Sequence, residues 1–220
     1  SVLYHNDGDG TFTNVSQILA DGDVGNPMLA ATFFDYDNDG DLDLYVVVDK
    51  NHGNVFWRND GPGCGGWCFT DVTVEVGADY AINGMGIATG DYDNDGDLDM
   101  YFTDIGEMYL LQNQTAQGEP VFVDVTVESG AWTPQVGWGA VMFDFDNDGW
   151  LDIYCANGMT FDLPDRNQLF WNKGDGTFDN ISEFSGADHP GMSQAVAYAD
   201  YDRDGFLDLA VGNNNQDYML

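Results

Sequence analysis

The chain has 220 residues, 43% of them hydrophobic, and it carries 39 acidic but only five basic side chains. The formal charge of −34 at pH 7 excludes nucleic acid as a natural partner and disfavours an anionic membrane surface. No run of residues is long and apolar enough to cross a bilayer, so membrane insertion is not expected.

Two short strands are expected first, over Ser1–Asn6 and Gly10–Ser16. They flank the turn Asp7–Gly10, whose Gly and Asp residues accept positive φ and favour a hairpin. The next strand is expected over Ala30–Asp35, and it runs directly into the acidic segment Asp35–Asp43.

This acidic segment recurs three more times at intervals of about 55 residues, and such a fixed period indicates a repeated supersecondary unit. Every copy has Asp at positions 1, 3, 5 and 9, Gly at position 6 and Leu at position 8. The copies are DYDNDGDLD over 35–43, DYDNDGDLD over 91–99, DFDNDGWLD over 144–152 and DYDRDGFLD over 200–208.

Carboxylates on a tight glycine turn are ligands that Ca²⁺ prefers, with backbone carbonyl groups and water completing the shell. An ordinary Asp/Asn/Gly turn could explain one copy but not four in register. Position 12 is apolar in every copy, which excludes EF-hand and dockerin-type loops because both need an acid there (Val46, Phe102, Cys155 and Val211).

We therefore predict four Ca²⁺ sites. The expected side-chain ligands are Asp35, Asp37, Asp39 and Asp43; Asp91, Asp93, Asp95 and Asp99; Asp144, Asp146, Asp148 and Asp152; and Asp200, Asp202, Asp204 and Asp208. Position 7 is expected to supply a backbone carbonyl, from Asp41, Asp97, Trp150 and Phe206.

Each acidic loop is predicted to join two strands. The strands before the loops are expected over Ala30–Asp35, Gly86–Asp91, Ala140–Asp144 and Ala195–Asp200. After each loop, apolar residues at positions 8, 10 and 12 have the period of two that indicates a half-buried strand.

Two further strands complete each repeat, with no helical periodicity between them. The third strands are expected over Ser1–Asn6, Asn54–Asn59, Met108–Asn113 and Asn167–Asn172, and the fourth over Gly10–Ser16, Trp67–Thr73, Pro120–Thr126 and Gly176–Ser182. Four-stranded units around an axis predict an all-β fold, a β-propeller.

The loops, the Leu-Tyr-x-Asn-x-Gly-Asp-Gly-Thr-Phe pattern and the stretch Gly137–Asp152 resemble FG-GAP/VCBS repeats over essentially the whole chain. The repeat sequences are most similar to those of secreted propellers of the cartilage acidic protein (ASPIC-type) family, and more distantly to those of the integrin α propeller. The resemblance implies calcium-stabilised blades for extracellular recognition or adhesion, with calcium loops on the lower face and ligands on the upper face.

Family propellers usually have seven blades, whereas residues 1–220 supply four repeats in a single propeller domain or segment. Two arrangements are compatible with this number. The chain is a segment of a larger propeller, or its N-terminal strand pair joins the C-terminal strands and closes a four-bladed ring.

Glycosylation sequons and cysteines bear on whether the protein is secreted into an oxidising compartment. Asn14, Asn113 and Asn180 begin glycosylation sequons, and Asn14 and Asn180 occupy matching repeat positions. Cys64 and Cys68 are expected to form a local disulfide in an oxidising compartment; free thiols or a metal pair are the alternatives. Cys155 takes an apolar strand position, so a buried thiol is expected there.

No nucleophile–base pair is evident. The three histidines, His5, His52 and His189, fall at unrelated repeat positions, and the paired carboxylates are assigned to calcium. Tyr80, Trp132, Trp138 and His189 lie between repeats, where packing is favoured over stacking on sugars. The expected ligand-facing connectors are Gln17–Met28, Val74–Gly84, Val127–Val136 and Glu183–Ser193.

The favoured function is an extracellular recognition, adhesion or scaffold module without catalysis, whose partner is an extracellular protein or glycan. One alternative is a self-assembling filament or surface-layer subunit that binds further copies of itself, since repeats can propagate head to tail. The other alternative is the propeller of a secreted enzyme that cleaves glycans or esters.

Overall fold

The computed structural model describes residues 2–19, 26–64, 66–117, 121–158 and 165–214. Ser1, Pro120 and the middle of the first predicted connector, residues 20–25, lie outside the described residues. The described part is all-β, with three four-stranded and three two-stranded antiparallel sheets.

The four-stranded sheets run in chain order from the first strand to the last, as the repeats predicted. They are β3 (Met28–Phe34), β4 (Asp43–Val48), β6 (Val55–Gly63) and β7 (Gly66–Asp71); β9 (Ile87–Gly90), β10 (Asp99–Thr103), β11 (Met108–Asn113) and β12 (Phe122–Asp124); and β13 (Gly137–Phe143), β14 (Asp152–Asn157), β15 (Gln168–Asn172) and β16 (Phe178–Asn180).

Two-stranded sheets stand at both ends of the chain and beside the first four-stranded sheet. They are β1 (Tyr4–Asn6) with β2 (Phe12–Asn14), β17 (Ser193–Ala199) with β18 (Asp208–Asn213), and β5 (His52–Gly53) with β8 (Ala81–Ile82). Among the described strands, β1 pairs with β2 and β17 pairs with β18, and no ladder joins these two hairpins. Within the described residues, the N-terminal pair therefore does not join the C-terminal strands, as one of the two alternatives had expected.

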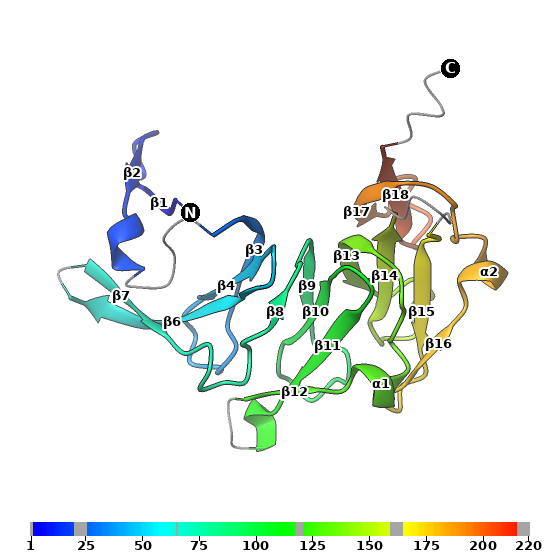
Figure 1. Cartoon of the computed structure of the whole chain (residues 1–220), viewed down its shortest axis with the longest axis horizontal. Helices are drawn as coiled ribbons and strands as arrows, with labels where there is room; N and C mark the ends of the chain where they lie inside the picture. The colour runs from blue at the N-terminus through cyan, green and yellow to red at the C-terminus, as the bar shows by residue number, and fades with distance from the viewer. Residues whose placement is uncertain (1, 20–25, 65, 118–120, 159–164, 215–220) are drawn as a thin grey trace.

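The sheets stand side by side in a curved row, with the two terminal hairpins at its opposite ends (Figure 1). The first strands of successive sheets, β3, β9, β13 and β17, are neighbours along the inner side of this row. They approach so closely that a Cβ on Gly86 would lie 2.0 Å from the carbonyl oxygen of Trp138, and one on Gly139 would lie 3.2 Å from Cα of Ala195. Glycine is thus required where the inner strands meet.

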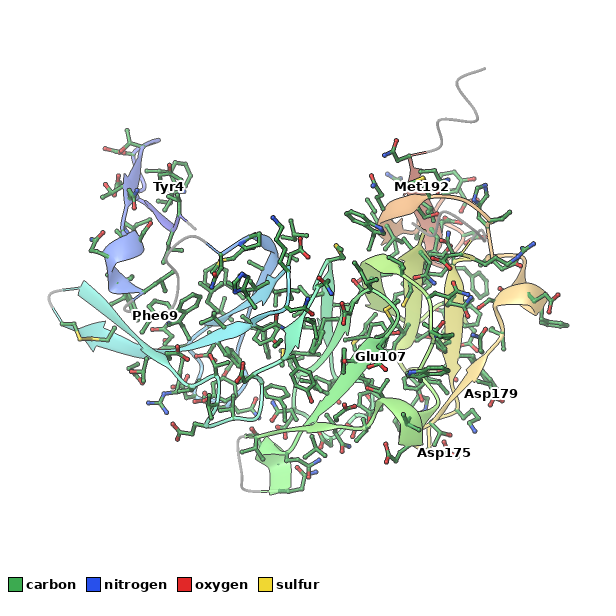
Figure 2. The ribbon with its side chains drawn as sticks, viewed as in Figure 1. Tyr4, Phe69, Glu107, Asp175, Asp179 and Met192 are labelled. Atoms are coloured by element: carbon green, nitrogen blue, oxygen red, sulfur yellow. A yellow bond between two sulfur atoms is a disulfide. The ribbon has the colours of Figure 1, made fainter. Side chains whose placement is uncertain are left out.

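Apolar side chains from neighbouring sheets fill the spaces between them (Figure 2). In β10, Met100 and Phe102 pack into the cluster shared with the preceding sheet, and Tyr101 packs into the cluster shared with the following sheet. All five residues of β10 are buried, as are all six of β4 and of β14. These three predicted half-buried strands are in fact covered on both faces, because each of them contributes side chains to two apolar clusters.

The described part of the chain has four one-turn helices after strands of the repeats, which the sequence did not predict. They are η1 (Ser16–Ile18), η2 (Thr115–Gln117), α1 (Thr126–Ser129) and α2 (Ser182–Ser185). The α1 and α2 turns end at Gly130 and Gly186, whose φ values of 80° and 76° are left-handed. A single turn is too short to produce a helical periodicity in the sequence.

Each sheet has two different edges. The loop edge carries the acidic loops between first and second strands and the turns between third and fourth strands. The connector edge carries the turns between second and third strands and the segments that lead to the next sheet. At the connector edge, the hydroxyl groups of Tyr45, Tyr101 and Tyr154 donate to the carbonyl oxygens of Ala78, Ala131 and Ala187, which fixes each connector.

Candidate metal centre

The four acidic loops fold in the same way at the loop edge. Position 4 is left-handed in every loop, with φ between 57° and 66° at Asn38, Asn94, Asn147 and Arg203, and position 6 is a glycine with φ between 90° and 97°. Asn tolerates this conformation better than most residues and Gly has no Cβ to oppose it, so the sequence Asn-Asp-Gly forms the turn locally. Arg203 is the departure from this pattern.

Hydrogen bonds from the backbone hold the carboxylates at positions 1 and 5. The two oxygens of each position-1 aspartate accept from the N–H groups of positions 5 and 6, over 2.9–3.2 Å in all four loops (Asp35, Asp91, Asp144 and Asp200). Each position-5 carboxylate accepts from the N–H of position 7, over 2.8–3.0 Å. These bonds orient the carboxylates without any positive side chain.

The position-9 aspartates connect the loops to the sheets. Their Oδ2 atoms accept from the N–H of position 2 of the same loop, over 3.1–3.2 Å. In three repeats, Oδ1 also accepts from the N–H of the third-strand asparagine, over 2.7–2.8 Å (Asn59, Asn113 and Asn172). Asp43, Asp99 and Asp152 are fully buried.

Burial changes the protonation of these position-9 groups. Loss of solvation raises the pKa of Asp43 and of Asp152 to about 7 and that of Asp99 to about 8; the backbone hydrogen bonds oppose this rise, and the neighbouring loop aspartates add to it. A negative charge at position 9 is therefore costly unless a cation lies beside it.

The position-3 aspartates carry the clearest sign of a cation. The Oδ1 atoms of Asp37 and Asp93 are buried and have no hydrogen-bond partner. Loss of solvation on burial is the main cause that raises the pKa of both groups, and repulsion from nearby loop aspartates adds to the rise. Buried polar atoms are nearly always partnered, so these two oxygens need an explanation. A bound cation would supply their partner.

The loops bring three carboxylate oxygens within 4.8 Å of one another in every repeat. The groups are Asp35, Asp37 and Asp39; Asp91, Asp93 and Asp99; Asp144, Asp146 and Asp152; and Asp200, Asp202 and Asp208. Positions 1 and 3 are thus brought together in all four loops, position 9 in the last three, and position 5 in the first only. The donors are all oxygen, which fits Ca²⁺ and does not fit zinc, whose structural sites use nitrogen and sulfur.

Two sets of asparagines, which the sequence reasoning did not identify, bind adjacent repeats together at the loop edge. At position 4, Asn38 donates to Oδ1 of Asp97 over 2.7 Å, and Asn94 and Asn147 donate to the carbonyl oxygens of Gly149 and Gly205 over 3.0 and 2.8 Å. Each of these bonds reaches the following loop.

The second set reaches the preceding loop. From the ends of third strands, the amide groups of Asn113 and Asn172 donate to the carbonyl oxygens of Tyr36 and Tyr92 over 2.7 and 2.8 Å. The recurrence of Asn at this strand end in every repeat was the available signal.

These contacts decide between the three sequons. Asn113 is fully buried, and its Nδ2, the atom that would carry a glycan, also donates to the carbonyl oxygen of Leu98. The folded structure leaves no room for a sugar there. Asn14 and Asn180 are exposed, and their Oδ1 atoms accept from the backbone and hydroxyl of the serine two residues later. Asp71 and Asp124 make the same bonds to threonines, so this turn alone can explain the motif.

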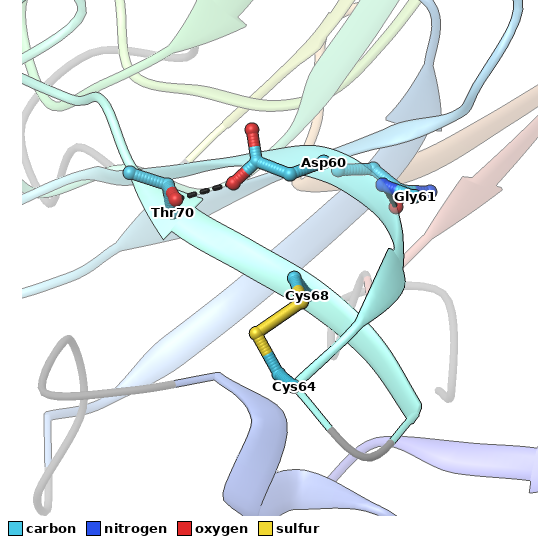
Figure 3. Close-up of a disulfide and its surroundings, with 6 residues drawn as sticks. Asp60, Gly61, Cys64, Cys68 and Thr70 are labelled. Carbon is cyan, nitrogen blue, oxygen red and sulfur yellow. Dashed lines mark hydrogen bonds between the residues drawn. A yellow bond between two sulfur atoms is a disulfide. The ribbon is translucent and has the colours of Figure 1, made fainter.

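A disulfide joins Cys64, in the turn after β6, to Cys68 in β7 (Figure 3). The third cysteine, Cys155, is buried and free, as expected, and its thiol contacts the hydroxyl of Tyr101 at 3.3 Å. Burial raises the pKa of this thiol to about 12, which makes it unreactive.

The aromatic residues between repeats do not form one cluster. Tyr80 packs edge-to-face on Phe102 and Tyr109, as the packing interpretation predicted. Trp132 is 46% exposed, and His189 is exposed at the connector edge. No helix in the described part of the chain is long and apolar enough to cross a membrane.

A family model described as FG-GAP-like repeat matches residues 1–46 and 144–211. The chain belongs to the FG-GAP-like repeat family. The second of these ranges contains two complete acidic loops, and the first contains the loop at 35–43, so the match rests on the same segments that build the sites.

Three similar proteins carry the name cartilage acidic protein 1. Those of Xenopus tropicalis and Mus musculus are 24% and 26% identical to this chain over 175 residues, which cover 76% of this chain and 26% of each relative. That of Homo sapiens is 25% identical over 179 residues, covering 74% of this chain and 25% of the relative. The chain spans about a quarter of the length of these relatives.

Proposed function

We propose that the protein is a calcium-stabilised β-propeller segment that acts outside the cell as a recognition or scaffold module and performs no chemistry. The observation that carries the proposal is the pair of buried, unpartnered carboxylate oxygens, on Asp37 and Asp93, in loops where three carboxylates converge. The curved row of sheets and the family membership support the propeller, and the names of the relatives support an extracellular place.

Calcium supplies positive charge and oxygen coordination in these loops, and this offsets repulsion among their carboxylates. Positions 1, 3, 5 and 9 are proposed as side-chain ligands and position 7 as a carbonyl ligand in all four loops. A ligand that binds only the folded chain adds about 2.7 kcal/mol of stability per site when its free concentration is one hundred times the dissociation constant. Several such sites decide whether the chain is folded.

The connector edge is proposed as the surface for an extracellular protein or glycan, or for further copies of the chain. Val74 and Val127, at the start of two connectors, are 77% and 72% exposed, and Phe184 is 94% exposed on α2. Covering these side chains with another molecule would remove their apolar surface from water, which favours binding at this edge. Tyr45 and its counterparts hold the connectors in place beneath this surface.

Three measurements test the proposal. Equilibrium dialysis followed by elemental analysis should return four calcium ions per chain, and fewer than three would contradict it. Thermal unfolding should occur at a substantially higher temperature in millimolar Ca²⁺ than in excess chelator, and equal melting curves would contradict the stabilising role. A turnover assay across glycans, esters and phosphoesters should detect no activity, and activity lost on a single connector substitution would favour the enzyme.

A further inference from the structure

The loops differ in one contact that the repeated sequence does not reveal. In two sheets, the third strand places the side chain before its final asparagine against position 3 of the loop. In β11 this residue is Gln112, whose Nε2 donates to Oδ2 of Asp93. In β15 it is Trp171, whose indole Nε1 donates to Oδ2 of Asp146 over 2.9 Å. A neutral donor therefore holds one oxygen of the position-3 carboxylate in each of these two loops.

The other oxygen of Asp93 is the buried one without a partner. Because Gln112 fixes the first oxygen, the second is directed away from that strand before any ion arrives. Orienting groups of this kind increase metal affinity by removing the entropy cost of positioning the ligand.

Arg58 occupies the same place in β6. It pairs with Thr70 across the sheet, as Gln112 pairs with Val123 and Trp171 with Asp179. Its Nε donates over 2.7 Å to Oδ1 of Asp60, an aspartate that also accepts from Thr70 (Figure 3). The guanidinium is thus held by Asp60, outside the loop.

Arg58 still lies beside the loop, because it holds the strand position from which Gln112 and Trp171 reach position 3 of their loops. Only five basic residues exist in the chain, and Arg203, at position 4 of the last loop, is another of them. The loops at 91–99 and 144–152 have no basic residue within them and a neutral residue at the third-strand position. A fixed positive charge beside a site for a divalent cation repels that cation.

We infer that the third-strand residue before the asparagine sets the calcium affinity of each loop, and that Arg58 makes the loop at 35–43 a weaker site than those at 91–99 and 144–152. This inference rests on the proposed calcium binding. The loops at 91–99 and 144–152 bind calcium at low calcium concentration, so their sheets stay ordered. The loop at 35–43 fills only at higher calcium, so the order of the β3–β7 sheet depends on the calcium concentration outside the cell.

The test is a reciprocal exchange, Arg58→Gln and Gln112→Arg, with calcium binding followed by isothermal titration of the calcium-free protein. The unmodified protein should show at least two affinity classes. Arg58→Gln should tighten a weak site by about five- to tenfold, and Gln112→Arg should weaken a tight site by a similar factor, because a guanidinium beside the site repels the ion. Arg166→Gln is the matched control, because Arg166 pairs with Asp188 at the connector edge and its loss removes the same charge.

A single affinity for all sites in the unmodified protein would overturn the inference while leaving calcium binding intact. So would an Arg58→Gln protein that binds calcium like the Arg166→Gln control. If one exchanged protein does not fold, the other carries the test alone, since the two make opposite predictions. Absence of any calcium binding at millimolar concentration would instead remove the proposed function itself.

Discussion

The loop edge and the connector edge of the sheets are built from the same repeats, yet they differ in how uniform they are from repeat to repeat. At the loop edge, the position-1, position-5 and position-9 hydrogen bonds recur from repeat to repeat with nearly constant lengths. At the connector edge, the anchoring tyrosines recur but the outward residues change, from Val127 on α1 to Glu183 and Phe184 on α2. The hydrogen bonds are uniform at the edge that holds the sheets together, and the exposed residues vary at the edge proposed to bind other molecules.

The largest expected effect is the loss of a position-9 carboxylate. Asp99→Ala removes the acceptor of two N–H groups, those of Tyr92 and Asn113, at a fully buried site. Each unsatisfied buried donor costs about 1–3 kcal/mol, so we expect a loss of about 4 kcal/mol in urea unfolding with calcium present. Asp208→Ala is the control, because the described structure gives Asp208 one such bond, from Tyr201, and the cost there should be about 1 kcal/mol. Equal losses would mean that burial at the loop edge does not matter.

A second prediction separates bonds between sheets from bonds within one sheet. Asn172→Ala removes donations to Tyr92 in the preceding repeat and to Leu151 in its own loop, and we expect a cost of about 3 kcal/mol in the free energy of unfolding. Asn59→Ala removes a donation to Leu42 within one repeat, at a more exposed position, and should cost about 1 kcal/mol. If both variants lose the same stability, the bond between sheets contributes nothing of its own.

Glycosylation provides a chemical comparison of the two edges. Asn113 ends its strand at the loop edge, whereas Asn14 and Asn180 begin turns at the connector edge. Protein secreted from eukaryotic cells should carry no glycan at Asn113, and any glycan should be confined to Asn14 and Asn180. Mass spectrometry of peptides after enzymatic deglycosylation measures the occupancy of each site. An occupied Asn113 in folded protein would contradict the buried position of its amide.

The smallest expected effect on stability is at the connector edge. Phe184→Ser changes a side chain that is 94% exposed, so the free energy of unfolding should change by no more than about 0.5 kcal/mol. Binding to a protein or glycan partner, measured by surface plasmon resonance once a partner is found, should weaken strongly. A destabilised variant with unchanged binding would reverse the assignment of the two edges.

Much of this architecture could be predicted from the sequence, because the fourfold repetition aligns every strand with three counterparts. The strand order, the loop positions and the clustered carboxylates followed from that alignment. Burial on both faces of β4, β10 and β14 could not be predicted, since alternation in one strand says nothing about a sheet that packs against it. The donations from Asn113 and Asn172 were missed because their acceptors lie 77 and 80 residues away along the chain.

The glycines on the inner side of the row have a consequence for the overall geometry. Gly86 and Gly139 let neighbouring sheets come nearly into backbone contact at one side, while aromatic side chains such as Phe56 and Phe122 separate them further out. Because the spacing is narrow on the inner side and wide on the outer side, successive sheets are inclined to one another at an angle. The size of these two residues therefore helps to set how strongly the row of sheets curves. Enlarging Gly86 or Gly139 is thus a way to alter that curvature, not only packing.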